Sequence, residues 1–139
     1  MHDLLTLQVR NSLDEIPHTA NVVSLCLAER QASLPAIHFA RLAVEELLSN
    51  CVKYAFADAA EHLIEITLSI EGGDLILTFT DDGLPFNPLT LPEPRIHVPI
   101  EERGIGGLGI HLLRKIADDL HYSRTDGKNR LTLRKSLSA

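Results

Sequence analysis

The sequence contains no apolar run long enough to cross a membrane and no cluster of basic residues. In its 139 residues no stretch approaches about 18 consecutive apolar side chains, the length that indicates a transmembrane helix. There are 13 Lys and Arg against 19 Asp and Glu, a formal net charge of -6. This balance argues against a nucleic-acid-binding surface. We therefore expect neither a membrane span nor a nucleic-acid partner.

Cysteine is scarce, and the histidines lack metal-site spacing. Cys26 and Cys51 lie far apart in helical apolar patterns, so we expect reduced structural thiols rather than a disulfide or a metal pair. The seven histidines show no H-x-x-x-H or Cys/His spacing, which argues against a dedicated zinc site. The first ten residues have neither a basic region nor a signal-like apolar run. We expect a cytoplasmic protein.

The composition and the apolar periodicity predict one α/β domain over residues 1–139. Apolar residues make up 45% of the chain and charged residues 23%, which is typical of a soluble globular protein. Alternating and helical patterns then predict the elements. In order, these are a strand at 4–10, helices at 16–31 and 35 to about 56, strands at 62–70 and 75–81, a helix at about 107–119, and a hairpin of 120–125 and 129–137.

Residues 82–103 differ from the rest of the chain. They hold five of the seven prolines and show no sustained period. Loops of about 20 residues are uncommon inside a compact domain, and those that occur are often functional lids or disordered. We therefore expect a lid at about 84–106.

The glycine run that follows has two competing interpretations. Gly104, Gly106 and Gly109 satisfy G-x-G-x-x-G, the spacing of a dinucleotide-binding turn. That turn needs a strand leading into it, whereas here a proline-rich loop leads in and a hairpin follows the helix. The glycines could simply permit a tight loop-to-helix junction. Alternatively, their free backbone N–H groups at a helix N-terminus could bind phosphate.

Two further polar motifs are candidates for the same site. Glu46 and Asn50 are four residues apart on one helical face, and Lys53 extends that strip. They could serve as base, magnesium ligand and phosphate contact, or form an ordinary solvated helix face. Asp81 ends a strand and Gly83 follows it. This pair could form a plain turn, or it could accept a hydrogen bond from the amine of a base that the glycine lets approach.

Taken in order, these motifs resemble a known ATP-binding domain. E-x-x-x-N-x-x-K-Y, then D-x-G, then G-x-G-G-L-G-I is similar to the domain shared by gyrase-type ATPases, Hsp90, histidine kinases and MutL (the GHKL superfamily). The two helices before the asparagine, the wording DDGLPFNP and the closing NRLTLRK resemble in particular the RsbW/SpoIIAB-like anti-sigma-factor serine/threonine kinases.

The resemblance implies a role for each matching residue. Glu46 would be the catalytic carboxylate that takes the proton from a substrate hydroxyl, and Asn50 would bind Mg²⁺ through the ATP phosphates. Lys53 would contact phosphate, Tyr54 would lie on the adenine side, and Asp81 would bind the adenine amine. The other expected nucleotide-binding residues are Gly83, Gly104, Gly106, Gly107, Leu108, Gly109 and Thr132.

The resemblance also implies a fold, an activity and partners. The fold would be a two-layer α/β sandwich with helices on one face of a mixed, mostly antiparallel sheet, and ATP·Mg²⁺ would lie between helices and lid. The γ-phosphate would pass to a Ser or Thr of a small STAS-type anti-sigma-factor antagonist. A sigma factor would be the second partner, and the protein would be a homodimer.

Some residues depart from that group and leave alternatives open. LPF follows the D-x-G motif instead of a further glycine, and NCVKYAF is closer to histidine kinases. The chain could be the ATP-binding part of a histidine-kinase-like system, a regulatory module that transfers no phosphate, or a stand-alone ATPase. Histidine kinases need an upstream phosphoacceptor His, usually followed by an acid, but His18 precedes Thr and His38 precedes Phe.

Overall fold

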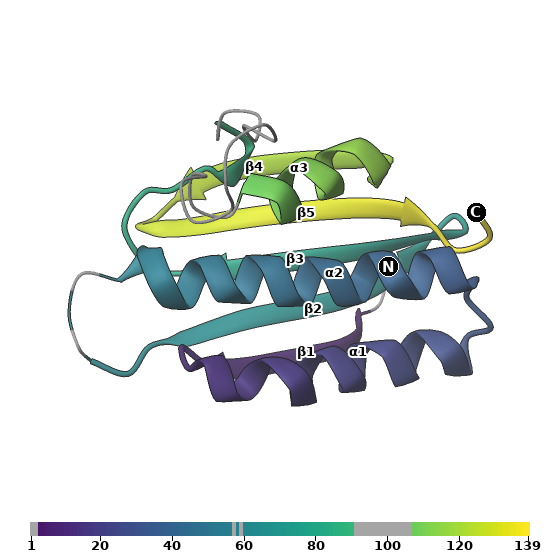
Figure 1. The fold of residues 1–139 in the computed structure, drawn as a ribbon, viewed down its shortest axis with the longest axis horizontal. Coiled ribbons are helices and arrows are strands. Elements are labelled where there is room, and N and C mark those ends of the chain that lie inside the picture. The colour runs from purple at the N-terminus through teal and green to yellow at the C-terminus, as the bar shows by residue number, and fades with distance from the viewer. Residues whose placement is uncertain (1–2, 57, 59, 91–106) are drawn as a thin grey trace.

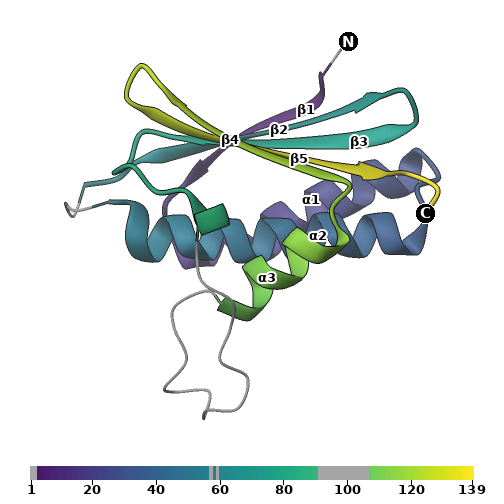
Figure 2. The ribbon, with the colours of Figure 1, turned by 90° about the horizontal axis from the view of Figure 1, so that it is seen from above.

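Three helices lie on one face of a five-stranded sheet, as Figures 1 and 2 show. The computed structural model describes residues 3–56, 58, 60–90 and 107–139. The strands lie in the order β1-β2-β3-β5-β4. Their bounds are β1 (Asp3–Arg10), β2 (Leu63–Glu71), β3 (Asp74–Asp81), β4 (Asp119–Thr125) and β5 (Lys128–Ser136). The helices are α1 (Ile16–Glu29), α2 (Leu34–Asn50) and α3 (Gly107–Ile116), with short helical turns η1 (Leu13–Glu15), η2 (Cys51–Ala55) and η3 (Pro88–Thr90).

This arrangement confirms the predicted two-layer α+β fold and corrects one detail of the sheet. All four pairings among the described strands are antiparallel, whereas a mixed sheet was expected. Two helices, α1 and α2, connect β1 to β2, so the chain returns to the end where β1 finished. In the described part of the chain, η3 and α3 lie between β3 and β4, and β5 lies between those two strands in the sheet and pairs antiparallel with both.

The core lies between the helices and the inward face of the sheet. On β2, the alternate residues Ile64, Ile66 and Leu68 are fully buried, because successive side chains of a strand point to opposite faces. The long helix α2 packs along the middle of this face and contributes most of the helical part of the core. Its buried apolar residues are Ala36, Phe39, Ala40, Ala43, Val44, Leu47 and Leu48.

The C-terminal end of α2, the end of β3 and the start of β5 lie close together at one edge of the two-layer fold. The predicted helix from 35 to about 56 is α2 followed at once by a π-helical turn, η2. β3 ends at Asp81 near that turn, since the Leu84 N–H donates to the Ala55 carbonyl at 2.7 Å. β5 starts beside the same place, because Asn129 pairs with Asp81 in the β3–β5 register. Helix ends, strand ends and a π-helical turn therefore converge there, and π-turns are frequent at functional sites.

Candidate functional site

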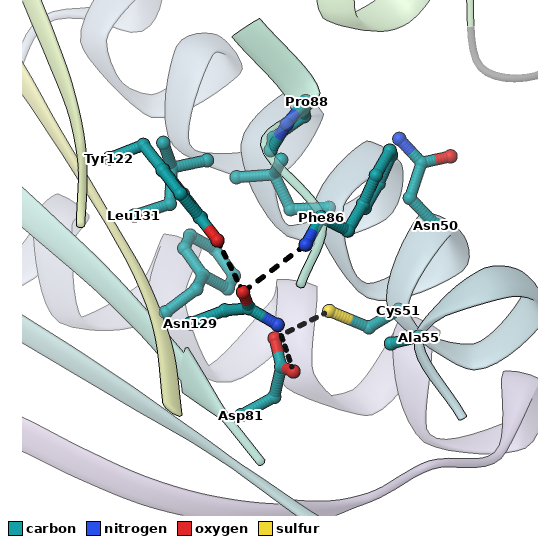
Figure 3. A pocket seen from close by; sticks show the side chains of 11 residues that line it. Asn50, Cys51, Ala55, Asp81, Phe86, Pro88, Tyr122, Asn129 and Leu131 are labelled. Atoms are coloured by element: carbon teal, nitrogen blue, oxygen red, sulfur yellow. Dashed lines mark hydrogen bonds between the residues drawn. The ribbon is translucent and has the colours of Figure 1, made fainter. Parts of the chain in front are cut away.

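A pocket opens where α2, η2, β3 and β5 converge. Figure 3 shows that Cys51 and Asn129 point toward Asp81, that Tyr122 points toward Asn129, and that the Asn50 amide is directed away from Asp81. Most of the wall is apolar, and the polar groups are few, as is usual for small-molecule sites. The lining residues are Leu47, Asn50, Cys51, Ala55, Phe79, Asp81, Phe86, Pro88, Tyr122, Asn129 and Leu131.

The two oxygens of the buried Asp81 carboxylate have different surroundings. Its Oδ1 accepts hydrogen bonds from the Gly83 N–H at 2.8 Å and from Asn129 Nδ2 at 3.0 Å. Its Oδ2 accepts only from the Cys51 thiol, at 3.5 Å, among the described residues. A thiol is a weak donor, so Oδ2 remains able to accept from a ligand N–H.

Cys51 lines this pocket but is not suited to act as a nucleophile. Burial, with the nearby Asp81 carboxylate, raises the pKa of the Cys51 thiol well above its ordinary value. The thiolate is the reactive form, so a raised pKa keeps this cysteine unreactive.

Gly83 closes the pocket edge and leaves no room for a side chain. A Cβ there would lie 2.4 Å from the Ala55 carbonyl oxygen and 2.9 Å from Asp81 Oδ1. The backbone therefore approaches η2 more closely than any other residue type allows. The predicted association of Asp81 and Gly83 is present, and the turn they form packs against the end of the helix.

Asn50 and Glu46 lie one turn apart on α2, as their spacing predicted. Asn50 lines the pocket with 4% exposure, and its Nδ2 has no hydrogen-bond partner among the described residues. Buried polar groups are nearly always paired, so an unpaired amide here points to a ligand or water contact.

The Glu46 side chain lies against the backbone of Gly109 in α3. Partial burial and the neighbouring Glu45 raise the pKa of the Glu46 carboxyl, while Lys53 opposes this shift. Glu46 is not among the residues that line the pocket around Asp81, but a partly buried carboxylate of raised pKa is suited to proton transfer.

The remaining predicted residues of this helix do not line the pocket. Lys53 and Tyr54 lie in the π-helical turn and are exposed, Tyr54 by 37%. The charge of Lys53 lowers the pKa of Glu46, so Lys53 lies close enough to Glu46 to affect it electrostatically.

The glycine run is only partly described. Gly104 and Gly106 lie outside the described residues, as do 91–103 of the predicted lid. Gly107 and Leu108 form the start of α3, and Gly109 follows in its first turn. The start of α3 at Gly107 agrees with the helix predicted from about residue 107.

Thr132 lies away from the pocket, and this corrects the expectation for the late strand. Asn129, Leu131 and Leu133 are buried toward the helices, so Thr132 faces the other side of the sheet, paired with Thr78 and His121. Asn129 occupies the position beside Asp81 instead. The strand alternation of NRLTL would have revealed this, since an inward Leu131 places residue 129 inward and residue 132 outward.

Comparison with known proteins agrees with this geometry. Residues 9–135 match the family described as the histidine kinase-like ATPase domain. The chain belongs to this family. Membership of the histidine kinase-like ATPase family implies ATP binding.

Two curated relatives of this ATPase-family chain are named as kinases. The serine/threonine-protein kinase BtrW of Bordetella bronchiseptica is 32% identical over 92 residues, which cover 66% of this chain and 65% of BtrW. The serine-protein kinase RsbW of Listeria innocua is 27% identical over 131 residues, or 91% of this chain and 83% of RsbW. The matched region is thus just under two thirds of the length of BtrW.

Solved structures show the same fold. The RsbU and RsbW domains of a Mycobacterium tuberculosis protein match with a TM-score of 0.68 and 18% identity, over 97% of this chain and 32% of that one. The histidine kinase domain of a blue-light-activated kinase from Erythrobacter litoralis matches with a TM-score of 0.55 and 18% identity, over 90% of this chain and 60% of that one.

Within residues 3–56, 58, 60–90 and 107–139, no helix is long and apolar enough to span a membrane. The same residues include no group of three or more His, Cys, Asp or Glu side chains placed to hold a metal ion.

Proposed function

We propose that this protein is an ATP-dependent serine/threonine protein kinase that acts as an anti-sigma factor. The observation that carries the proposal is the position of Glu46, a partly buried carboxylate of raised pKa one helical turn from the unpaired amide of Asn50. A module that only binds nucleotide has no need of such a base. Support also comes from BtrW and RsbW, which are both named as protein kinases.

The nucleotide base would bind in the pocket of Figure 3. Asp81 Oδ2 would accept a hydrogen bond from the 6-amino group of adenine, while Phe79, Phe86 and Leu131 supply apolar walls. This puts the triphosphate toward Asn50, Glu46 and the first turn of α3.

The phosphates would be held mainly by backbone and by Lys53. The N-terminus of α3, at Gly107, Leu108 and Gly109, offers free N–H groups and the positive end of the helix dipole to an anion. Gly104 and Gly106 would complete the cradle from the lid at about 84–106. Lys53 would add an exposed positive charge at the edge of the site.

Asn50 fits a magnesium ion bound together with the phosphates. Its side chain supplies an amide oxygen, the hard ligand type that Mg²⁺ takes alongside substrate phosphates. When bound, the ion would neutralise charge on the β- and γ-phosphate oxygens.

Glu46 would act on the substrate hydroxyl. As the Ser or Thr oxygen forms its bond to the γ-phosphorus, Glu46 accepts the hydroxyl proton. The bond between the γ-phosphorus and the β,γ-bridging oxygen breaks, and ADP leaves. Most of the rate enhancement would come from positioning and charge neutralisation, because phosphoryl transfer needs little covalent work from the protein.

The protein substrate would be a STAS-type anti-sigma-factor antagonist, and the regulated partner a sigma factor. We expect a homodimer located in the cytoplasm, where both partners would be found.

The test begins with capture of partners from cell extract in ATP and in ADP, followed by a search for phosphorylated Ser or Thr on what is captured. Glu46→Gln is the matched variant, since it keeps shape and removes the base. We expect it to abolish transfer from labelled ATP and to leave the ATP Kd within about twofold. Full transfer by this variant would refute the role of Glu46, and ATP binding without transfer by the wild type would favour a silent regulatory module.

A further inference from the structure

Asn129 is the most highly connected side chain of the pocket, and none of the three motifs includes it. It lies at the start of β5 with 5% exposure, directly opposite Asp81 in the strand register. Figure 3 shows its amide between Asp81 and the segment that carries Phe86.

The amide nitrogen of Asn129 uses both of its donors. Nδ2 donates to Asp81 Oδ1 at 3.0 Å and to the Leu84 carbonyl at 2.8 Å. The Gly83 N–H also donates to Oδ1, so this oxygen of Asp81 accepts two hydrogen bonds within the protein. The oxygen left for a ligand is therefore Oδ2, whose one partner among the described residues is the weakly donating Cys51 thiol.

The amide oxygen of Asn129 accepts hydrogen bonds from residues on the apolar side of the pocket. It accepts from the Phe86 N–H at 3.3 Å, from Arg124 at 3.0 Å and from the Tyr122 hydroxyl. Phe86 and Tyr122 both line the pocket, and Arg124 also donates to the Gly83 carbonyl at 2.9 Å. The Asn129 side chain thus connects Asp81, the polar residue of the proposed base site, to Phe86 and Tyr122 on its apolar side.

We infer that Asn129 is a positioning residue that sets base specificity, by holding Asp81 as a pure acceptor against Phe86. This inference rests on the proposed ATP-binding function of the pocket. A base with a 6-amino group donates to Asp81 Oδ2, whereas a base with a 6-oxo group presents an acceptor and is repelled. Discrimination depends on Asp81 staying fixed in this orientation, and Asn129 Nδ2 donates to its Oδ1.

The decisive variant is Asn129→Asp, which keeps the shape and the acceptor oxygen, replaces the donating nitrogen with an oxygen and places a second carboxyl group beside Asp81. ATP and inosine triphosphate differ in the 6-position group, so their Kd values can be measured side by side by calorimetry. Loss of a hydrogen bond to a charged group predicts ATP binding weaker by about 10- to 100-fold, with little change for the 6-oxo nucleotide.

Two further variants keep the result interpretable. Arg130→Gln, the exposed neighbour on the outer face of β5, should leave both Kd values unchanged. If Asn129→Asp does not fold, Tyr122→Phe removes one donor to the Asn129 oxygen and should weaken ATP binding by about 2- to 10-fold. Tyr122→Phe should also lower the ratio of the inosine triphosphate Kd to the ATP Kd.

The outcomes separate this inference from the proposed function. Parallel losses for both nucleotides, or an unchanged preference in the folded variants, would overturn the role of Asn129 alone. Failure of the wild-type protein to bind ATP would overturn the proposed function, and this inference with it.

Discussion

Glu46 and Gly109 touch so closely that position 109 cannot carry a side chain without moving the carboxylate. A Cβ on Gly109 would lie 1.9 Å from Glu46 Cδ and 2.1 Å from Oε2. The contact joins α2 to α3, and it places the proposed base beside the helix end that would hold the phosphates. Glycine at 109 thus makes room for a side chain from another helix.

The first prediction follows from this contact. Gly109→Ala should lower the rate of phosphate transfer at saturating ATP by at least about tenfold, since misplacement of a reacting group by about 1 Å is costly. The fold should survive, because alanine favours the helix and the overlapping atoms belong to a flexible side chain. Thermal unfolding and transfer assays would be compared with Lys115→Ala, an exposed site on the same helix. Unchanged transfer in Gly109→Ala would show that Glu46 relaxes without consequence.

Gly83→Ala should act differently, on stability as well as on binding. The overlap here is with the Ala55 carbonyl, a backbone atom that cannot rotate away. Overpacking of this kind costs about 1–3 kcal/mol, and the shifted turn would carry Asp81 with it. Urea unfolding and ATP titration should both report the loss. Gly73→Asn is the control, because nothing lies within 4 Å of that glycine and Asn tolerates its positive φ.

The pH dependence of transfer should reflect the raised pKa of Glu46. A base must be deprotonated, so activity falls as the pH drops through that pKa, at a higher pH than for an ordinary carboxylate. Glu45→Gln removes a charge that raises the pKa and should shift the acidic limb to lower pH. Lys53→Gln removes a charge that lowers it and should shift the limb to higher pH. Profiles of kcat against pH at saturating ATP would test both; shifts in the same direction would contradict the assignment.

A histidine beside the pocket should make stability depend on pH. His62 contacts Asp58 Oδ1 at 2.7 Å and Asp82 Oδ1 at 3.2 Å, and its ring stacks on Phe56 with centroids 4.2 Å apart. Hydrogen bonding to Asp58, with both carboxylates nearby, raises the pKa of His62, and the same bond lowers the pKa of Asp58. Arg124, which lines the same cavity, is the opposing charge.

The sign of the effect follows from these directions. The histidine contribution is complete below its ordinary pKa of 6.5 and is lost as the pH rises through the raised value. The Asp58 contribution is complete above 3.8 and is lost as the pH falls through the lowered value. The difference in urea midpoint between wild type and His62→Asn should therefore be largest near pH 5 and smaller at pH 8. A difference that is constant with pH would show that the stacking, not the charge, matters.

Much of the fold could be predicted from local patterns. The strand at 62–70 and its partner at 75–81 alternate cleanly around a Gly-Gly turn, and both formed within one or two residues of the predicted bounds. The helix at 107–119 was also correct in place, although α3 ends at Ile116. These elements are determined by residues close in sequence, so periodicity is sufficient to find them.

The site was only partly predictable. Glu46 and Asn50 share a helix face, and Asp81 and Gly83 share a turn, so spacing alone placed each pair correctly. Tyr54 does not line the pocket, and Thr132 was misplaced there because its orientation depends on which face of β5 meets the helices.

The sequence by itself determined the order of the elements and the chemistry available to each, because helix and strand periods and turn residues act over a few positions. Only the tertiary structure decided that Asn129 lies opposite Asp81 and that Glu46 rests on Gly109. Those contacts span 48 and 63 residues of chain (129 − 81 and 109 − 46). Strand register and helix packing bring them together, and both are set by burial of the whole core rather than by any local motif.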